Sequence, residues 1–277
     1  MTLATINFKT EFAVDMTCQN CVDAVSKALR DVSGVERYDI DLEKKRVTVT
    51  GRTPPSHLLS ALKSTNRQVI VRGASSASPL SISQAAIAII ESPLPLPTSM
   101  ASTSNPVLAG GTNRSLPGMN EEEHSQKVFG ICRFVQIAPK TVLMDLTVRL
   151  PPPSNVGLNP AKSAFNVYIS STGNLVDPPF TTGKAFLPLG QVEPDQGGYG
   201  DMFKEIDGEL WEWVGRGCIL EAANQPIQST PQSSLGRIFA GVVARSSGIW
   251  GNEKTVCACS GRTMWEEDRD MEKKNTL

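Results

Sequence analysis

The stretch Asp15-Met16-Thr17-Cys18-Gln19-Asn20-Cys21 decides the fold of the first part of the chain. It follows an apolar, strand-like run and opens a helical pattern in which Val25 and Leu29 share one face with Cys21. The first thiol is therefore expected in a loop and the second in the first turn of a helix, where the helix dipole favours thiolate over thiol. Two close thiolates are soft ligands that suit Cu(I). We predict that Cys18 and Cys21 bind Cu(I).

Composition limits the classes of protein to which the chain can belong. Its 277 residues suit two modest domains with linkers, and its formal net charge of −1 leaves no basic excess to neutralise phosphates, so nucleic acid is not expected as a partner. No apolar run approaches the length of a membrane span and no signal pattern begins the chain, so we expect no membrane insertion and a cytoplasmic location. In a reducing compartment, six cysteines indicate metal or redox chemistry rather than structural disulfides.

Residues 1–73 are predicted to form a small α+β domain. Strand and helix signals follow one another in the order βαββαβ, which is that of the ferredoxin-like sandwich, with two helices on one face of an antiparallel sheet. The expected elements are a strand at 6–14, a helix ending near Gly34, strands at 35–42 and 46–50, a helix at 54–63 and a strand at 68–71. The Gly/Ala/Ser-rich run at 73–78 is predicted to be a flexible linker.

The rest of the chain is predicted to be mostly β. Residues 74–126 are expected to form a linker with a first barrel strand at about 84–91 and a mobile loop. Short strands separated by Gly, Pro and Asn predict an all-β Greek-key barrel or sandwich over 127–244, followed by a mostly irregular tail over 245–277. Its strands are expected at 128–137, 141–150, 165–170, 211–221 and 238–244.

The thiol-bearing stretch, placed in the first loop of a βαββαβ unit, resembles the MxCxxC signature of the heavy-metal-associated domain. That family includes copper chaperones and copper-transporting ATPases. The resemblance implies that Cys18 and Cys21 are Cu(I) ligands and that Met16 packs beneath the loop. It also implies a cation near the metal at Arg67, which would offset the negative charge of a bis-thiolate complex. A thioredoxin-like redox pair is the rival reading of a bare CxxC.

Residues from about 80 to 250 resemble Cu,Zn superoxide dismutase, but without its metal ligands. Tyr168 and Ser170 stand where the enzyme has a His-x-His pair, and Glu221 stands where its last copper histidine lies. The whole chain has only His57 and His124, so neither metal site can be built and no dismutase activity is expected. The resemblance is carried by Gly130-Ile131-Cys132-Arg133-Phe134, by Tyr168-Ile169-Ser170-Ser171-Thr172-Gly173-Asn174, by Gly215-Arg216-Gly217-Cys218-Ile219-Leu220 and by Gly241-Val242-Val243-Ala244.

A barrel of this kind without metal ligands can serve as a docking surface for the enzyme it resembles. The closing strand and the turn after it provide the candidate docking residues, which are Arg245, Ser246, Gly248 and Trp250. Cys132 and Cys218 lie in predicted barrel strands and are expected to be buried free thiols, with a disulfide as the alternative.

A second cysteine pair, Cys257-Ala258-Cys259, lies in the tail. Together with the two domains before it, this CxC makes nearly the whole chain similar to the copper chaperones for superoxide dismutase. The resemblance implies a metallochaperone, not an enzyme, that pairs with Cu,Zn superoxide dismutase as a heterodimer. Cys257 and Cys259 would bind the metal, pass it on and help to form the client's disulfide. It further implies a homodimer and a presence in the mitochondrial intermembrane space and nucleus.

Two other functions compete with copper delivery. A thiol-disulfide oxidoreductase would use the CxC pair as its redox couple and bind copper only incidentally. A copper storage protein is disfavoured, because four metal-competent thiols store little and the barrel would have no purpose.

Overall fold

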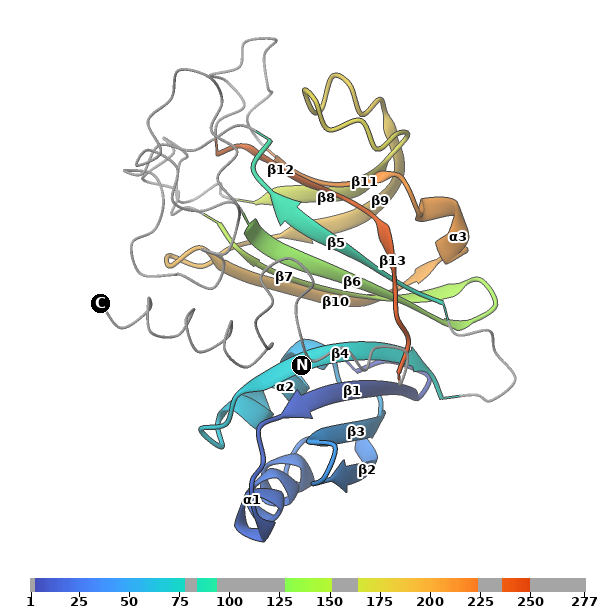
Figure 1. Cartoon of the computed structure of the whole chain (residues 1–277). Coiled ribbons are helices and arrows are strands. Elements are labelled where there is room, and N and C mark those ends of the chain that lie inside the picture. Colours follow the sequence, from blue (N-terminus) through green and yellow to red (C-terminus); the bar gives the residue numbers. More distant parts are fainter. Residues whose placement is uncertain (1–2, 78–83, 94–127, 151–163, 224–235, 250–277) are drawn as a thin grey trace.

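The computed structural model describes residues 3–77, 84–93, 128–150, 164–223 and 236–249. Within these ranges the chain folds into a small α+β domain (β1 to β4, the N-terminal domain) that lies against a larger all-β domain (β5 to β13, the barrel), as Figure 1 shows. This arrangement confirms the predicted fold class of both domains.

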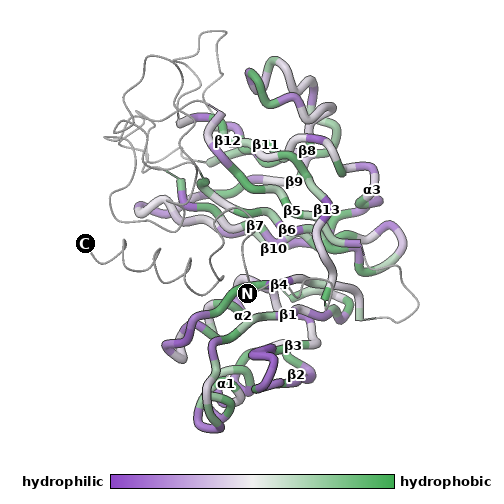
Figure 2. Tube along the Cα trace, viewed as in Figure 1, coloured by the Kyte–Doolittle hydropathy of each residue, from purple (hydrophilic) through white to green (hydrophobic). Residues whose placement is uncertain are grey.

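The N-terminal domain has the predicted βαββαβ order. Its antiparallel sheet has the order β2-β3-β1-β4, and edge strand β2 is largely hydrophilic (Figure 2). The elements are β1 (Phe8–Val14), α1 (Gln19–Arg30), β2 (Val35–Asp41), β3 (Arg46–Gly51), α2 (Pro55–Lys63) and β4 (Val69–Ser76).

Both helices of this domain bury an apolar stripe on the same face of the sheet. Val25 and Leu29 of α1 and Leu62 of α2 have no exposed surface and pack with Phe12 of β1. Burying each such side chain stabilises the fold by roughly 1.5–3 kcal/mol. Between α1 and β2 the backbone turns at Gly34 with φ +86°, a conformation that side-chain-bearing residues rarely adopt.

The prediction of a flexible linker from residue 73 is wrong. Strand β4 continues to Ser76, and Ser75 and Ser76 pair with Lys9 and Phe8 of β1. Small polar residues gave no strand signal, but Ser76 is buried and its Oγ donates a hydrogen bond to the Ile137 carbonyl of the barrel at 3.0 Å. Contact with the second domain therefore extends the strand beyond its apolar part.

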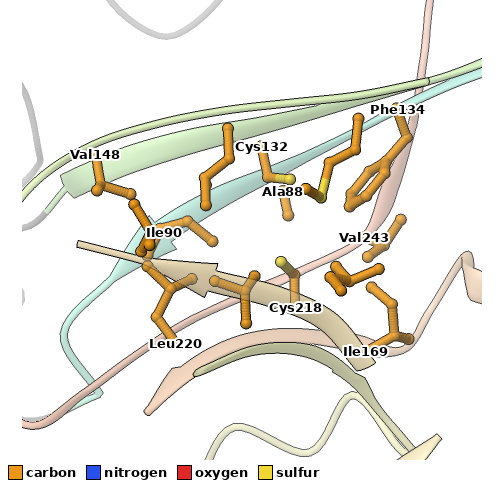
Figure 3. Close-up of a cluster of buried hydrophobic side chains, with 14 of the residues drawn as sticks. Ala88, Ile90, Cys132, Phe134, Val148, Ile169, Cys218, Leu220 and Val243 are labelled. Atoms are coloured by element: carbon orange, nitrogen blue, oxygen red, sulfur yellow. The ribbon is translucent and has the colours of Figure 1, made fainter. Parts of the chain in front are cut away.

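The barrel is one antiparallel sheet with the order β10-β7-β6-β5-β12-β11-β8-β9, and β13 pairs with β5. Side chains from its facing strands fill a single core (Figure 3). The strands are β5 (Ala85–Glu91), β6 (Val128–Ala138), β7 (Thr141–Arg149), β8 (Phe165–Ser170), β9 (Ala185–Val192), β10 (Tyr199–Asp207), β11 (Gly217–Ala222), β12 (Ile238–Val242) and β13 (Ala244–Ser246).

The structure corrects the sequence analysis in two parts of the barrel. The single strand expected at 211–221 is a short helix, α3 (Leu210–Trp213), followed by β11. Trp213 anchors this helix because its buried ring packs edge-on against Phe134, with the ring centroids 5.6 Å apart. Strands β9 and β10 were not expected, because Pro188 and Gly190 interrupt β9 and charged residues are spread along β10.

Two of the six cysteines lie in the barrel core. Cys132 of β6 and Cys218 of β11 have no exposed surface and are free thiols, as expected. In Figure 3 their sulfur atoms point toward one another across the core. Burial, followed by the neighbouring Cys218, raises the pKa of Cys132 well above its ordinary value, so this thiol stays protonated and unreactive.

None of the helices in the described ranges is long and apolar enough to cross a membrane.

Candidate metal centre

The thiols of Cys18 and Cys21 meet at the start of α1. Cys18 is the N-cap residue, with extended backbone angles (φ −157°, ψ 171°), and its carbonyl accepts the backbone N–H of Cys21 at 3.0 Å. This geometry places the two Sγ atoms 3.4 Å apart. Because thiolate–metal bonds are about 2.3 Å long, both sulfurs can contact one ion with little movement. Cys18 is exposed and Cys21 is buried, so an ion would approach from the side of Cys18.

Hydrogen bonds to the sulfur of Cys21 favour its thiolate. The backbone N–H and then the hydroxyl of Thr17, with Oγ1 3.7 Å from Sγ, lower the pKa of Cys21 from 9.0 to about 6, and the Cys18 thiol adds to the effect. Burial works in the opposite direction but does not prevail. A metal-ready thiolate is therefore present at neutral pH, as the position at a helix N-terminus led us to expect.

Met16 lies beneath the thiol loop, in the core of the N-terminal domain. Its side chain is 1 % exposed and belongs to the same apolar cluster as Cys21 and Val25. This location agrees with a supporting position under the loop. Its effect on metal binding stays a prediction.

Two further loops come to the thiol end of the domain. The Asp15 N–H donates to the Gln68 carbonyl at 3.0 Å, so the α2–β4 loop that holds Arg67 lies at this end. The β2–β3 turn arrives there too, because the Val14 N–H donates to the Lys45 carbonyl and the Lys45 ammonium lies 2.6 Å from Asp15 Oδ1. The role of Arg67 stays a prediction.

Lys45 is a residue of this end that the sequence analysis missed. The sequence analysis predicted strands on either side of it, at 35–42 and 46–50, but assigned it no role, and its positive φ of 51° marks the turn between them. The turn immediately precedes β3, which runs antiparallel to β1, so it must lie at the end of β1 where the thiols are, and that topological signal could have identified Lys45.

The barrel residues at which the sequence analysis noted missing metal ligands have hydrogen-bond partners within the protein. The Tyr168 hydroxyl donates to Glu221 Oε2 at 2.8 Å, and the Ser170 hydroxyl donates to the Thr172 carbonyl at 2.7 Å. Burial, reinforced by Glu221, raises the pKa of Tyr168, so the phenol stays neutral. Across the described part of the chain no group of three or more His, Cys, Asp or Glu residues could hold an ion.

The candidate docking residues are only partly within the described residues. Arg245 and Ser246 lie on β13, opposite Ala86 and Ala85 of β5, and Arg245 is exposed. Gly248 lies against the N-terminal domain at Gly73. Trp250 and the tail cysteines Cys257 and Cys259 lie outside the described residues, and so does His124.

Comparison with known proteins agrees with this arrangement. The heavy-metal-associated domain family matches residues 11–74, which hold the thiol loop and all but the ends of the N-terminal domain. A superoxide dismutase 1 copper chaperone of Debaryomyces hansenii is 30 % identical over 285 residues, which cover 95 % of each chain. The chain belongs to the family of copper chaperones for superoxide dismutase.

Relatives in this family extend from yeasts to mammals. The superoxide dismutase 1 copper chaperone of Saccharomyces cerevisiae is 26 % identical over 95 % of each chain. The human copper chaperone for superoxide dismutase is 29 % identical over 93 % of this chain and 88 % of its own. Among solved structures, the copper(I)-loaded first domain of the human copper chaperone is 40 % identical over 27 % of this chain and 99 % of that domain, with a TM-score of 0.24.

Membership in this family confirms the expectation of a metallochaperone rather than an enzyme, since its members are named as copper chaperones. Copper is thus the metal of the family, and the close pair of sulfurs in the thiol loop suits its cuprous form.

Proposed function

We propose that this protein acquires Cu(I) at Cys18 and Cys21 and delivers it to Cu,Zn superoxide dismutase. One observation carries the proposal: the sulfurs of the exposed Cys18 and the buried Cys21 lie 3.4 Å apart, and the pKa of Cys21 is lowered to about 6. The domain that holds them is joined to a barrel that has Tyr168, Ser170 and Glu221 at the positions of the expected metal ligands. Such a molecule can hold copper but cannot use it for dismutation. Exchange of one thiolate ligand for another suits delivery. In a three-coordinate intermediate the incoming sulfur binds copper before an outgoing sulfur leaves, so the ion is never released.

The barrel, in this proposal, selects the client through strands β5, β12 and β13 and forms a heterodimer with it. Ile89 of β5 and Val242 of β12 expose 47 % and 40 % of their surface on neighbouring strands, and Arg245 is exposed beside them on β13. Exposed apolar residues on adjacent strands suit an interface between two similar barrels. Arg245 and Ser246 belong to the same edge, and Trp250 follows it in sequence. The same surface would serve a homodimer in the absence of client.

The tail thiols Cys257 and Cys259 would receive the ion, pass it to the client and assist the client's disulfide by thiol exchange. Met16 and Arg67 would support the N-terminal site, the first by packing and the second by charge. This work would take place in the cytoplasm, where thiols stay reduced.

The decisive experiment is an activation assay with metal-free, disulfide-reduced dismutase. Replacement of Cys257 and Cys259 by serine should abolish client activation while leaving copper bound at Cys18 and Cys21. Replacement of Ile89 and Val242 by aspartate should abolish capture of the client in a pull-down without changing copper binding. Full activation by the tail variant, or capture by the charged variant as strong as that of the unaltered chain, would contradict the proposal.

A thiol-disulfide oxidoreductase is the second candidate, and the CxC pair is the feature that favours it. Maturation of the client with and without Cu(I), with disulfide and metal content scored separately, distinguishes the two functions. Disulfide formation that proceeds equally well without copper, and without any delivery of metal, would favour the oxidoreductase.

A further inference from the structure

Two carboxylates of the barrel hold the N-terminal domain against it. Asp145 of β7 is 2 % exposed and accepts two hydrogen bonds from Ser56 of α2, one from the hydroxyl at 2.8 Å and one from the backbone N–H at 3.2 Å. Glu205 of β10 accepts the hydroxyl and the backbone N–H of Thr5, both at 2.6 Å. A charged acceptor makes such bonds strong. These two groups are named the Asp145 clamp and the Glu205 clamp.

The rest of the interface between the domains is small. Phe8 of β1 packs against Phe203 of β10 with ring centroids 6.5 Å apart, within a short apolar cluster. Burial raises the pKa of Asp145, although Arg133 at 3.6 Å acts in the opposite direction, so the clamp keeps its charge at a cost. Two domains joined by contacts of this kind ordinarily separate and rejoin. Docking of the N-terminal domain on the barrel is therefore expected to be an equilibrium that further contacts shift.

Strand β13 belongs to the proposed docking surface for the client and is weakly held. It has only three residues, and within the described part of the chain it pairs with β5 alone. Arg245, at its centre, is exposed and lies opposite Ala86 of β5, three residues from the exposed Ile89. A strand this short, with a partner on one side, has little stability of its own. Its position on β5 therefore depends on what else it touches.

The residues that follow β13 contact the N-terminal domain. Beyond β13 the chain runs from the barrel down to β4 (Figure 1), where Ser247 and Gly248 lie directly on Gly73. A Cβ atom at Gly73 would lie 2.7 Å from the Gly248 carbonyl oxygen and 2.8 Å from that of Ser247. Gly73 is therefore required for the close approach of the two backbones. One short segment thus touches the client surface at one end and the N-terminal domain at the other.

We propose that β13 couples two events, docking of the client on the barrel and docking of the N-terminal domain on the barrel. A client seated on β5, β12 and β13 holds β13 in place, so that Ser247 and Gly248 stay on Gly73. In return, a docked N-terminal domain holds β13 against β5 and presents Arg245 to the client. Each event strengthens the other by the same factor, because coupling between two equilibria is reciprocal. This inference rests on the proposed function, since it requires the client to bind at these strands.

The two clamps provide the measurement of docking. The backbone N–H groups of Thr5 and Ser56 both donate to a barrel carboxylate, and Ser56 lies in the first turn of α2, where an amide has no partner within the helix. Their hydrogen exchange in D2O therefore reports separation of the domains. Metal-free, disulfide-reduced Cu,Zn superoxide dismutase should slow exchange at both amides several-fold. The Val14 amide is the control, because it donates to Lys45 within the N-terminal domain, and its exchange should not change.

The reverse direction is measured as the affinity for the same client. Gly73→Val should weaken client binding several-fold, because its side chain forces Ser247 and Gly248 off β4, although Gly73 lies outside the proposed docking surface. Ser56→Ala, which removes one of the two bonds of the Asp145 clamp, should do the same to a smaller extent. Gly197→Val is the matched control, since a Cβ atom there meets only Asp195 Oδ1 at 3.3 Å, and it should leave client affinity unchanged.

Unchanged Cu(I) affinity of the N-terminal thiols would show that this domain still folds in both variants. If Gly73→Val failed that check, Ser56→Ala would decide. The inference would be overturned if the client bound without slowing exchange at either clamp amide, or if correctly folded variants bound the client as tightly as the unaltered chain. Those results would leave copper delivery intact. Absence of any client binding by the unaltered chain would refute the proposed function itself, so the two failures are distinguishable.

Discussion

The thiol loop and the Tyr168–Glu221 region of the barrel differ in what their polar side chains do. In the loop, Thr17 directs its hydrogen bonds at the sulfur of Cys21 and lowers its pKa, so a charged ligand lies beside the exposed Cys18. In the barrel, Tyr168 donates to Glu221 and is held neutral. A metal site needs charged ligands that an ion can reach, and within the described residues the thiol loop provides them.

The largest effect should follow removal of the loop ligands. Replacement of Cys18 and Cys21 by serine should lower Cu(I) affinity at the N-terminal domain by several orders of magnitude, because hard hydroxyl oxygens replace soft thiolates. Competition with a chromophoric Cu(I) chelator, on a chain that also has Cys257→Ser and Cys259→Ser, measures the change.

The barrel thiols provide the control for that experiment. Cys132→Ala and Cys218→Ala remove two thiols that have no exposed surface, and they should leave Cu(I) affinity unchanged. Loss of copper from this control would mean that the barrel core also takes part in binding, and the contrast between the two regions would not hold.

The second prediction concerns pH. The pKa of Cys21 is lowered from 9.0 to about 6, so its thiolate is fully available above that pH and is lost as the pH falls through it. Below the pKa a proton competes with copper for this sulfur, so affinity should drop by about tenfold per pH unit from this group alone. The measurement is a chelator competition from acid to neutral pH.

Thr17→Val is the matched variant for the pH experiment. It removes the hydroxyl but keeps the shape of the side chain and the backbone N–H, so the onset of the loss should move to higher pH without disappearing. If Cu(I) affinity began to fall at the same pH as in the unaltered chain, the Thr17 hydroxyl would not lower the pKa of Cys21.

The third prediction addresses the barrel. Tyr168→Phe removes the donor to a partly exposed Glu221, so it should lower the free energy of unfolding by about 1 kcal/mol without changing Cu(I) affinity. Chemical denaturation monitored by fluorescence gives the first quantity. Tyr199→Phe on β10 is the control, because this ring is 41 % exposed, and its effect should be smaller. An equal effect of the two substitutions would refute a structural role for the Tyr168–Glu221 bond.

Local signals explain which parts of this structure could be predicted. Cys18, Cys21 and the helix that begins beside them are neighbours in sequence, so spacing alone predicted both the loop and its chemistry. Strand β9 gave no such signal, since it holds a proline at 188 and a glycine at 190 and most of its residues are at least partly exposed. Its place is set by pairing with β8, which is a property of the folded sheet.

The contact between the domains lay beyond sequence reasoning for a related reason. Asp145 interrupts an apolar strand and would ordinarily be read as a residue that faces solvent. Its partner Ser56 is 89 positions away, in the other domain. Strand β4 was predicted too short for a similar reason, because Ser75 and Ser76 give no apolar signal although both are buried in the folded chain, and the hydroxyl of Ser76 bonds to the barrel.

The smallest expected effect concerns Lys45, the residue of the thiol end that sequence reasoning missed. Its ion pair with Asp15 is close, at 2.6 Å, but the two side chains are 38 % and 29 % exposed, so solvent screens the attraction. Lys45→Gln should therefore change the free energy of unfolding by less than about 1 kcal/mol, and the change should shrink further in high salt. Thermal unfolding at low and high salt tests this. Lys44→Gln is the neighbouring control, because the Lys44 ammonium is 3.9 Å from Asp41 and more exposed.

A large loss of stability or of Cu(I) affinity in Lys45→Gln alone would mean that the Lys45 cation acts on the thiol loop directly. The difference between the loop and the barrel would then depend on the charges around the site as well as on the ligands themselves.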